Sequence, residues 1–158
     1  MRTVSAMLEH GLALFIDYGY GRAEYYHPQR HAGTLRCHYR HRAHDDPFRL
    51  PGLEDITAHV DFSAMAQAAE SVGAGLLGFA TQAQFLLSCG LAERLGRSPD
   101  PIEQARENAA VQRLVGPGAM GESFKVLAIG RGVRGPLAGF RLAARSPSEK
   151  EASARPFG

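Results

Sequence analysis

The chain has 158 residues, of which 44% are hydrophobic and 22% are charged, and its formal net charge is +2. These values are typical of one globular domain with a buried core, and the nearly balanced charge excludes a strong electrostatic bias toward nucleic acids or membranes. The two cysteines, Cys37 and Cys89, form no CxxC motif, which favours a reduced protein of the cytoplasm without a structural zinc site.

The amino-terminal part predicts a helix end followed by a strand. Residues 1–9 have the apolar spacing of the last turns of a helix and resemble neither a signal peptide nor a transmembrane helix. The run GLALFIDYGY at 11–20 predicts a buried strand that ends at Asp17 and opens into a loop over residues 18–33. Because ligands of open α/β sheets bind at the carboxyl ends of strands, Asp17 and Tyr18 are candidates for the lip of a cleft. A core strand that merely ends in a turn explains the same residues equally well.

The middle of the chain predicts two further strands and a helix. The segment TLRCHYRH at 34–41 alternates between two faces with the period of a half-exposed strand. Residues 56–60 form a short strand-like run that leads to Asp61. Asp61 is a good N-cap for a helix over residues 62–72, in which apolar residues recur at helical spacing.

The chain from residue 74 onward predicts two strands and two helices. The strands are expected over residues 74–79 and 124–129, and the helices over residues 82–89 and 101–115. Thr81 and Gln84 have the spacing of a capping box at the start of the first of these helices. The chain is thus predicted to be one α/β unit over residues 1–140, and residues 141–158 are expected to form a disordered tail.

A basic, histidine-rich segment follows the first predicted strand. Three histidines and two aspartates in it raise the hypothesis of a divalent metal site: His38, His41, His44, Asp45 and Asp46. A spacing of three residues, however, puts His38 and His41 on opposite faces of a strand, and we therefore predict basic surface and no metal site. Nucleic-acid binding through the tyrosines and basic residues of this segment is a weaker hypothesis, because the net charge is nearly balanced.

The segment EDITAHVDF contains a second set of candidate residues. Four of its polar residues would share one face of an extended segment that runs into a helix start: Asp55, Thr57, His59 and Asp61. A helix amino terminus with a histidine and carboxylates beside it can orient a polar or cationic substrate group. The alternative is structural: Asp61 caps the helix, Thr57 bonds locally and His59 satisfies a backbone carbonyl.

Several common catalytic motifs are missing from the sequence. It contains no GxGxxG loop after a strand, no P-loop, no GxSxG elbow and no HExxH helix. The residues by themselves therefore predict an α/β domain with a polar cleft near Asp17, His59 and Asp61.

Four segments resemble one family, the MidA-like (DUF185) methyltransferases, which use S-adenosylmethionine and include the mitochondrial complex I assembly arginine methyltransferase. The segments are ALFIDYGY at 13–20, PGLEDITAHVDF at 51–62, TQAQFLLSCGL at 81–91 and GAMGESFKVLAI at 118–129. The resemblance implies the carboxyl-terminal half of a class I, Rossmann-like methyltransferase sheet with loop and helical insertions. Residues 1–140 would then be a partial domain that lacks the amino-terminal, cofactor-binding half.

The resemblance also implies a function. It suggests S-adenosylmethionine as the cofactor and protein arginine as the methyl acceptor, in an enzyme part that we expect to be inactive alone. By position, Asp17 or Asp61 would orient the guanidinium, with Tyr18, Asp55, Thr57 and His59 as substrate-binding residues.

The alternative function is a non-catalytic interaction fragment that docks through an exposed sheet edge or through the basic insertion. Leu14 and Ile16 would lack the strands on which they pack, and we therefore expect self-association through this edge.

Overall fold

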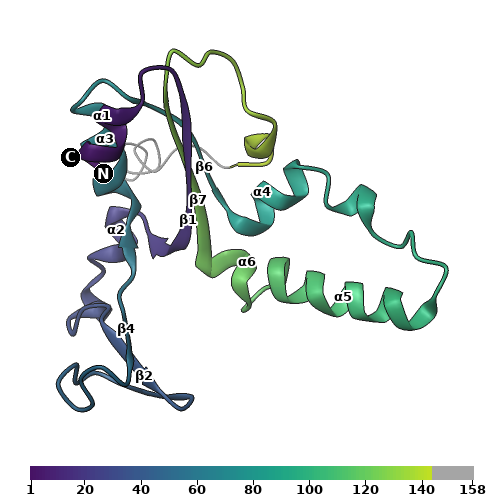
Figure 1. Cartoon of the computed structure of the whole chain (residues 1–158), viewed down its shortest axis with the longest axis horizontal. Helices are drawn as coiled ribbons and strands as arrows, with labels where there is room; N and C mark the ends of the chain where they lie inside the picture. Colours follow the sequence, from purple (N-terminus) through teal and green to yellow (C-terminus); the bar gives the residue numbers. More distant parts are fainter. Residues whose placement is uncertain (144–158) are drawn as a thin grey trace, which may run out of the picture.

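The computed structural model describes residues 1–143, and a four-stranded sheet lies at its centre (Figure 1). In spatial order the strands are β5 (Val60–Asp61), β1 (Gly11–Tyr20), β7 (Phe124–Arg131) and β6 (Gly75–Thr81). β7 pairs antiparallel with both β1 and β6, whereas β5 runs parallel to the end of β1. The predicted α/β class is confirmed.

Short helices connect and cover the strands. They are α1 (Arg2–Met7), α2 (Arg22–Tyr25), α3 (Phe62–Glu70), α4 (Gln82–Ser88), α5 (Pro101–Val115) and α6 (Met120–Ser123), with 3-10 turns at Pro28–Arg30, Ala92–Arg94 and Ala138–Phe140. Both predicted caps are confirmed: Asp61 Oδ1 accepts the N–H of Ala64 at 2.9 Å, and Thr81 and Gln84 form a reciprocal capping box. Of the helices that the structure describes, none is both long and apolar enough to cross a membrane.

The core lies between α3 and one face of the central sheet. Its buried cluster joins α3 to β7 and the start of β6 through Phe62, Ala69, Ala74, Leu127 and Ile129. β1 adds Ala13 and Phe15, which point to the same face and pack against this cluster. Burial of these apolar side chains is the main favourable contribution to the folding of the sheet.

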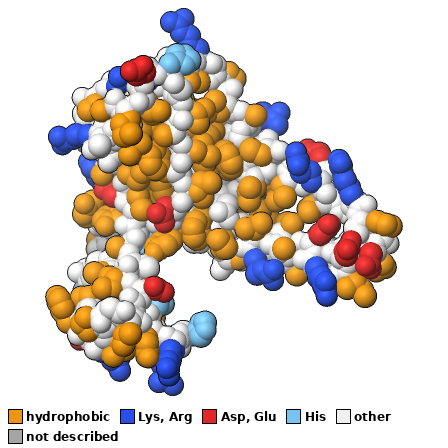
Figure 2. All heavy atoms as spheres, in the orientation of Figure 1, with side chains coloured by type: hydrophobic (Ala, Val, Ile, Leu, Met, Phe, Trp, Pro, Cys, Tyr) orange, Lys and Arg blue, Asp and Glu red, His pale blue; other side chains and the backbone are white. Residues whose placement is uncertain are grey.

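The other face of β1 is apolar and exposed. Leu12, Leu14 and Ile16 are 44%, 40% and 52% exposed, and Figure 2 shows hydrophobic side chains gathered over the central sheet. One edge of β1 is also open, because β5 pairs only with Gly19 and Tyr20 and no other strand within residues 1–143 covers positions 11–18 on that side. The expectation that Leu14 and Ile16 meet solvent is confirmed.

A second, three-stranded sheet lies apart from the central one (Figure 1). Its strands are β2 (Arg36–Tyr39), β3 (Arg42–His44) and β4 (Asp55–Thr57), and β2 pairs antiparallel with both neighbours. The segment between β1 and β5 is therefore folded. We call its three strands, with the loops that join them, the small sheet.

The small sheet corrects two sequence predictions. The strand expected over 34–41 ends at Tyr39, because Arg40 and His41 have positive φ angles of 47° and 64° and turn the chain back into β3. Positive φ at both central residues is the geometry of a type I′ hairpin, which Asn and Gly usually form. The strand expected over 56–60 is divided, since β4 belongs to the small sheet and β5 to the central one.

Other predicted boundaries differ by smaller amounts. β1 continues to Tyr20, and the loop expected over 18–33 contains α2 and a 3-10 turn. β6 ends at Thr81 and β7 at Arg131, whereas the helix over 101–115 is confirmed at both ends. The tail prediction falls mainly on residues 144–158, which lie outside the described residues.

Gly19 permits the contact between β1 and β5. A Cβ atom at this position would overlap the backbone carbonyl of Val60 and lie 2.7 Å from its nitrogen. We expect Gly19→Ala to lower the free energy of unfolding by about 1–3 kcal/mol, because backbone atoms cannot move aside as a flexible side chain can. Denaturant unfolding measures this change.

Gly75→Ala is the matched control. Gly75 is also a strand glycine of the central sheet, but the nearest atom to a Cβ there is 3.9 Å away. The Gly75→Ala variant should unfold at the wild-type denaturant concentration or above it. Equal losses in the two variants would show that β5 does not need the close approach at Gly19.

Candidate functional site

Three rings gather at the carboxyl end of β1. Tyr18 and Tyr20 lie on the same face of the strand, and His59 stands directly before β5, which pairs with β1 at this point. The His59 ring stacks on Tyr20 with centroids 4.9 Å apart and meets Tyr18 edge-on at 5.3 Å. Tyr18 also contacts Phe124 at the start of β7, with centroids 5.6 Å apart. We call Tyr18, Tyr20 and His59 the ring cluster.

An open groove of about 470 Å³ adjoins the ring cluster. It is lined by Tyr20, Glu24, Arg30, Gly118, Ala119, Glu122, Ser123 and Lys125, so it lies between the segment after β1 and the segment before β7. The guanidinium of Arg30 sits 4.0 Å above the centre of the Tyr20 ring and donates to the backbone carbonyl of Glu24 at 2.6 Å. The groove therefore holds a guanidinium against an aromatic face, with two glutamates in the same lining.

Asp61 has a structural role beside this groove. It pairs with Tyr20 in the ladder between β1 and β5, caps α3, and its Oδ2 lies 4.0 Å from Nε of Arg22. Arg22 in turn donates its backbone N–H to Ser63 Oγ at 3.0 Å and a side-chain N–H to Gln67 Oε1 at 2.8 Å. Asp61 thus helps to hold α2 against α3, and its carboxylate faces a guanidinium of the chain itself.

Asp17 does not share a face with Tyr18. Because β1 runs through Tyr20 rather than ending at Asp17, consecutive side chains alternate, and these two point to opposite faces. Asp17 is exposed, stands opposite Lys125 in the antiparallel ladder, and its Oδ1 accepts the N–H of Tyr18 at 2.8 Å. Asp17 and Tyr18 therefore do not share one face of β1, and their predicted place at the lip of a cleft stays a prediction.

Asp55 and Thr57 lie outside the ring cluster. Both belong to β4 in the small sheet, where Asp55 pairs with His38 and the Thr57 hydroxyl donates to the carbonyl of Arg36 at 3.2 Å. The division of the segment at residues 58–59 separates them from Asp61, so the predicted common face of Asp55, Thr57, His59 and Asp61 does not exist. The structural alternative for Thr57, a local hydrogen bond, is wrong, because the acceptor Arg36 lies 21 residues away on the neighbouring strand β2.

The structural alternative for His59 is a hydrogen bond from its side chain to a backbone carbonyl, and the structure shows other contacts. Its backbone N–H donates to Thr34 Oγ1 at 3.2 Å, and its Nδ1 is buried with no hydrogen-bond partner in the described part of the chain. The two tyrosine rings, rather than a carbonyl, are the contacts that the structure gives to the imidazole.

The sequence analysis missed most of the groove. Glu24 and Arg30 come from the segment predicted as a loop, whereas Lys125 lies on the predicted strand 124–129 and Glu122 just before it. The neighbourhood of the two pairs depends on the pairing of β1 with β7. Tyr20 could have been predicted as a site residue, because it follows Tyr18 at the two-residue spacing that keeps strand residues on one face.

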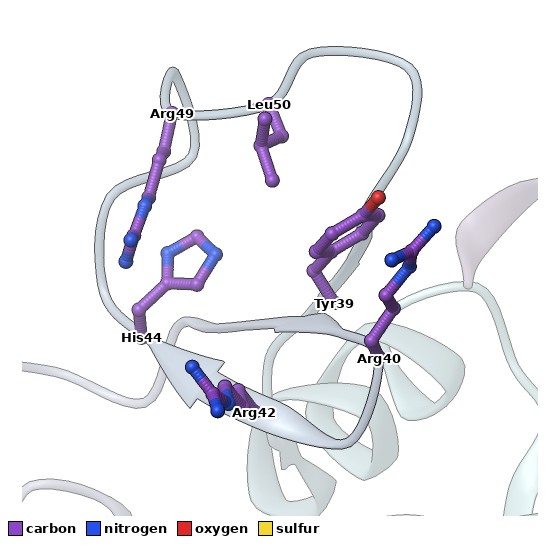
Figure 3. A pocket seen from close by; sticks show the side chains of 6 residues that line it. All are labelled: Tyr39, Arg40, Arg42, His44, Arg49 and Leu50. Carbon is purple, nitrogen blue, oxygen red and sulfur yellow. The ribbon is translucent and has the colours of Figure 1, made fainter.

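A second cavity of about 560 Å³ lies in the small sheet (Figure 3). Its lining is strongly basic and consists of Tyr39, Arg40, Arg42, His44, Arg49 and Leu50. Cys37 is fully buried next to it on β2. Burial raises the pKa of the Cys37 thiol, and the nearby carboxylates, Glu54 first, raise it further.

The curated relatives of this chain are arginine methyltransferases by name. The chain is 35% identical over 123 residues to the protein arginine methyltransferase NDUFAF7, mitochondrial, of Rattus norvegicus, and 34% identical over 122 residues to that of Danio rerio. Each matched region is 75% of this chain but 26% and 27% of the respective relative, so the chain spans about a quarter of their length.

Two crystal structures from Burkholderia thailandensis have the same fold over most of this chain. An uncharacterized COG1565 superfamily protein is 52% identical and has a TM-score of 0.89, with 93% of this chain and 40% of that chain covered. A COG1565 superfamily member bound to S-adenosyl-homocysteine is also 52% identical, with a TM-score of 0.87, and the coverage is 93% of this chain and 38% of that chain.

A family model matches residues 1–80, half of the 158 residues, and is described as "Putative S-adenosyl-L-methionine-dependent methyltransferase". The matched region contains β1, β5 and α3, which build the ring cluster and the core. The resemblance identified in four segments of the sequence is thereby confirmed, and this chain belongs to the family of S-adenosyl-L-methionine-dependent methyltransferases.

Proposed function

We propose that this chain supplies the acceptor side of a methyltransferase that acts on arginine side chains of proteins. The names of the curated relatives support arginine as the methyl acceptor. The solved relative with bound S-adenosyl-homocysteine supports S-adenosylmethionine as the methyl donor. Within residues 1–143, no strand of the central sheet is followed by a GxGxxG loop, which is a common phosphate- and nucleotide-binding signature. The proposal therefore concerns how the acceptor is bound.

The observation that carries the proposal is the guanidinium in the groove. The Cζ atom of Arg30 lies 4.0 Å from the centre of the Tyr20 ring, with Glu24 and Glu122 in the same groove lining. An aromatic face restrains the plane of a guanidinium, and a carboxylate binds two of its N–H groups at once. A substrate arginine needs an aromatic face and a carboxylate for the same purpose, since methyl transfer requires one nitrogen to be held in line with the methyl group.

The carboxylates near the groove have different surroundings. Asp61 is paired with Tyr20 across the strands and is 12% exposed at its side chain, so a charge there acts with little screening. Asp17 is exposed on the opposite face of β1. We propose Asp61 as the orienting carboxylate, with Asp17 as the second candidate and Tyr18 and His59 as the wall that keeps Tyr20 in place.

Asparagine substitutions separate the charge of these residues from their structural roles. Asp61→Asn keeps a side-chain oxygen that caps α3 and removes the negative charge. We expect methyl transfer to arginine to fall about 100-fold through misorientation of the acceptor, whereas loss of the pair with Arg22 lowers the free energy of unfolding by no more than about 1 kcal/mol. The assay uses labelled S-adenosylmethionine and a chimaera in which residues 1–143 replace the matched region of the Burkholderia thailandensis protein.

Controls decide what a loss of activity means. Glu70→Gln removes an exposed charge at the far end of α3 and should leave the rate unchanged. Asp17→Asn tests the second candidate in the same assay. Wild-type rates in both asparagine variants would remove the two aspartates from the mechanism, and a wild-type chimaera that labels no arginine would contradict the proposed acceptor.

A second candidate function is supported by the open edge of β1. Positions 11–18 have no strand partner on one side within residues 1–143, and the same strand exposes Leu12, Leu14 and Ile16. An unpaired edge next to an apolar face is a template for pairing with another strand. We propose that two copies of this chain associate through β1.

A lysine on this face should prevent the association. We expect Ile16→Lys to shift the protein from dimer to monomer in sedimentation velocity, because the charge would be buried in the interface. Ile102→Lys is the control, since Ile102 is 66% exposed on α5, away from β1. A wild-type chain that sediments as a monomer at every concentration would overturn this candidate.

A further inference from the structure

Three potential metal ligands converge in the small sheet. The ligand atoms of Cys37, His44 and Glu54 all lie within 4.8 Å of one another. Cys37 is on β2, His44 is the last residue of β3, and Glu54 directly precedes β4. None of the three belongs to the ring cluster or to the groove beside it.

The strand pairing places these side chains together. Cys37 is the partner of His44 in the ladder between β2 and β3, so their side chains leave the same face of the sheet. On the other side Cys37 pairs with Ile56, and Glu54 stands two residues before Ile56, which is the spacing for that same face. The hairpin turn at Arg40 and His41 fixes this register.

The nitrogen and oxygen atoms of the His44 and Glu54 side chains are buried and lack hydrogen bonds of good geometry to other described residues. The side chain of Glu54 is fully buried and that of His44 is 13% exposed. Nε2 of His44 lies 2.8 Å from Oε2 of Glu54, but neither these atoms nor His44 Nδ1 and Glu54 Oε1 make a hydrogen bond of good geometry within residues 1–143. A buried carboxylate is costly unless a cation or several donors compensate its charge.

We propose that Cys37, His44 and Glu54 bind one Zn²⁺ ion. Thiolate, imidazole and carboxylate are the three protein ligand types of zinc, and three protein ligands leave a fourth position for a water molecule. Ligand atoms around a tetrahedral zinc ion lie about 3.3–3.6 Å apart, so the cluster needs only small side-chain adjustments. On binding, the Cys37 thiol loses its proton to solvent and the thiolate, neutral His44 and the Glu54 carboxylate make the site neutral overall.

The ion would hold the small sheet together. Its three strands are short, and the segment between β3 and β4 is a long loop that carries Arg49 and Leu50 (Figure 3). A metal that joins β2, β3 and the residue before β4 closes that loop, as structural zinc ions do in small domains. Figure 3 shows the ring of His44 pointing into the pocket under this loop.

The competing explanation is an ion pair between His44 and Glu54 with Cys37 as a bystander. The two explanations differ in the role of sulfur, because a metal recruits the thiolate and an ion pair does not. Co²⁺ is a spectroscopic probe for this difference, since a thiolate ligand gives a sulfur-to-cobalt charge-transfer band that imidazole and carboxylate lack.

The first measurement uses the whole 158-residue chain without an affinity tag. After treatment with a chelator, the chain should bind one equivalent of Zn²⁺ in competition with a chromophoric chelator. It should also develop the charge-transfer band with one equivalent of Co²⁺, and the Zn²⁺ form should unfold at a higher temperature than the metal-free form. The absence of the cobalt band in the wild-type chain would overturn the proposal.

The second measurement removes the ligands one at a time. Cys37→Ser and Glu54→Gln should each lower the Zn²⁺ affinity at least 10-fold, and Cys37→Ser should abolish the charge-transfer band. The matched controls, Cys89→Ser and His38→Ala, remove an exposed cysteine and an exposed histidine and should change neither property. Circular dichroism verifies that each variant is folded.

Either of two results would contradict the site. One is an unchanged Zn²⁺ affinity in folded Cys37→Ser and Glu54→Gln, and the other is loss of binding in His38→Ala, which would point to adventitious surface binding. If a ligand variant does not fold, the cobalt band of Cys89→Ser decides, because Cys37 is then the sole source of thiolate in the chain.

Discussion

The close approach of two backbones at the end of β1 is the constraint on which the site depends. β5 is only two residues long, and it is held by its pairing with Gly19 and Tyr20, where any side chain on Gly19 would strike Val60. This short pairing sets the positions of His59 before β5 and of Asp61 at its end. The ring cluster and the cap of α3 therefore depend on a residue that itself has no side chain.

The same pairing explains why the chain separates into two structural units. The chain leaves the central sheet after Tyr20, builds the small sheet, and returns at Val60. A tyrosine and side chains of both charges line the groove at the central sheet, whereas arginines, a buried thiol and a buried glutamate occupy the small sheet. The groove proposed for the arginine acceptor and the proposed zinc site thus share no side chain, and each proposal can be tested independently.

Local sequence signals predicted those elements that local interactions determine. The cap at Asp61 and the box of Thr81 and Gln84 need few distant contacts, and the strand around Leu127 has a continuous apolar run as its local signal; all three are confirmed. The division between β4 and β5 and the hairpin at Arg40 and His41 depend on pairing between distant segments, and the hairpin lacks the usual Asn or Gly. For the same reason the metal hypothesis considered neighbouring histidines and missed Cys37 and Glu54, which only the sheet brings to His44.

The topology of β1 and β7 has a consequence for the order in which the chain folds. Residues 11–18 of β1 pair with residues 124–131 of β7, more than 100 residues away in the sequence, and closing so large a loop costs entropy before any contact compensates it. The hairpin of β2 and β3 and the segment from α3 to β6 involve much shorter separations. We expect these local units to form early and the central sheet to form late, as contact order predicts for strands that meet from opposite ends of a chain.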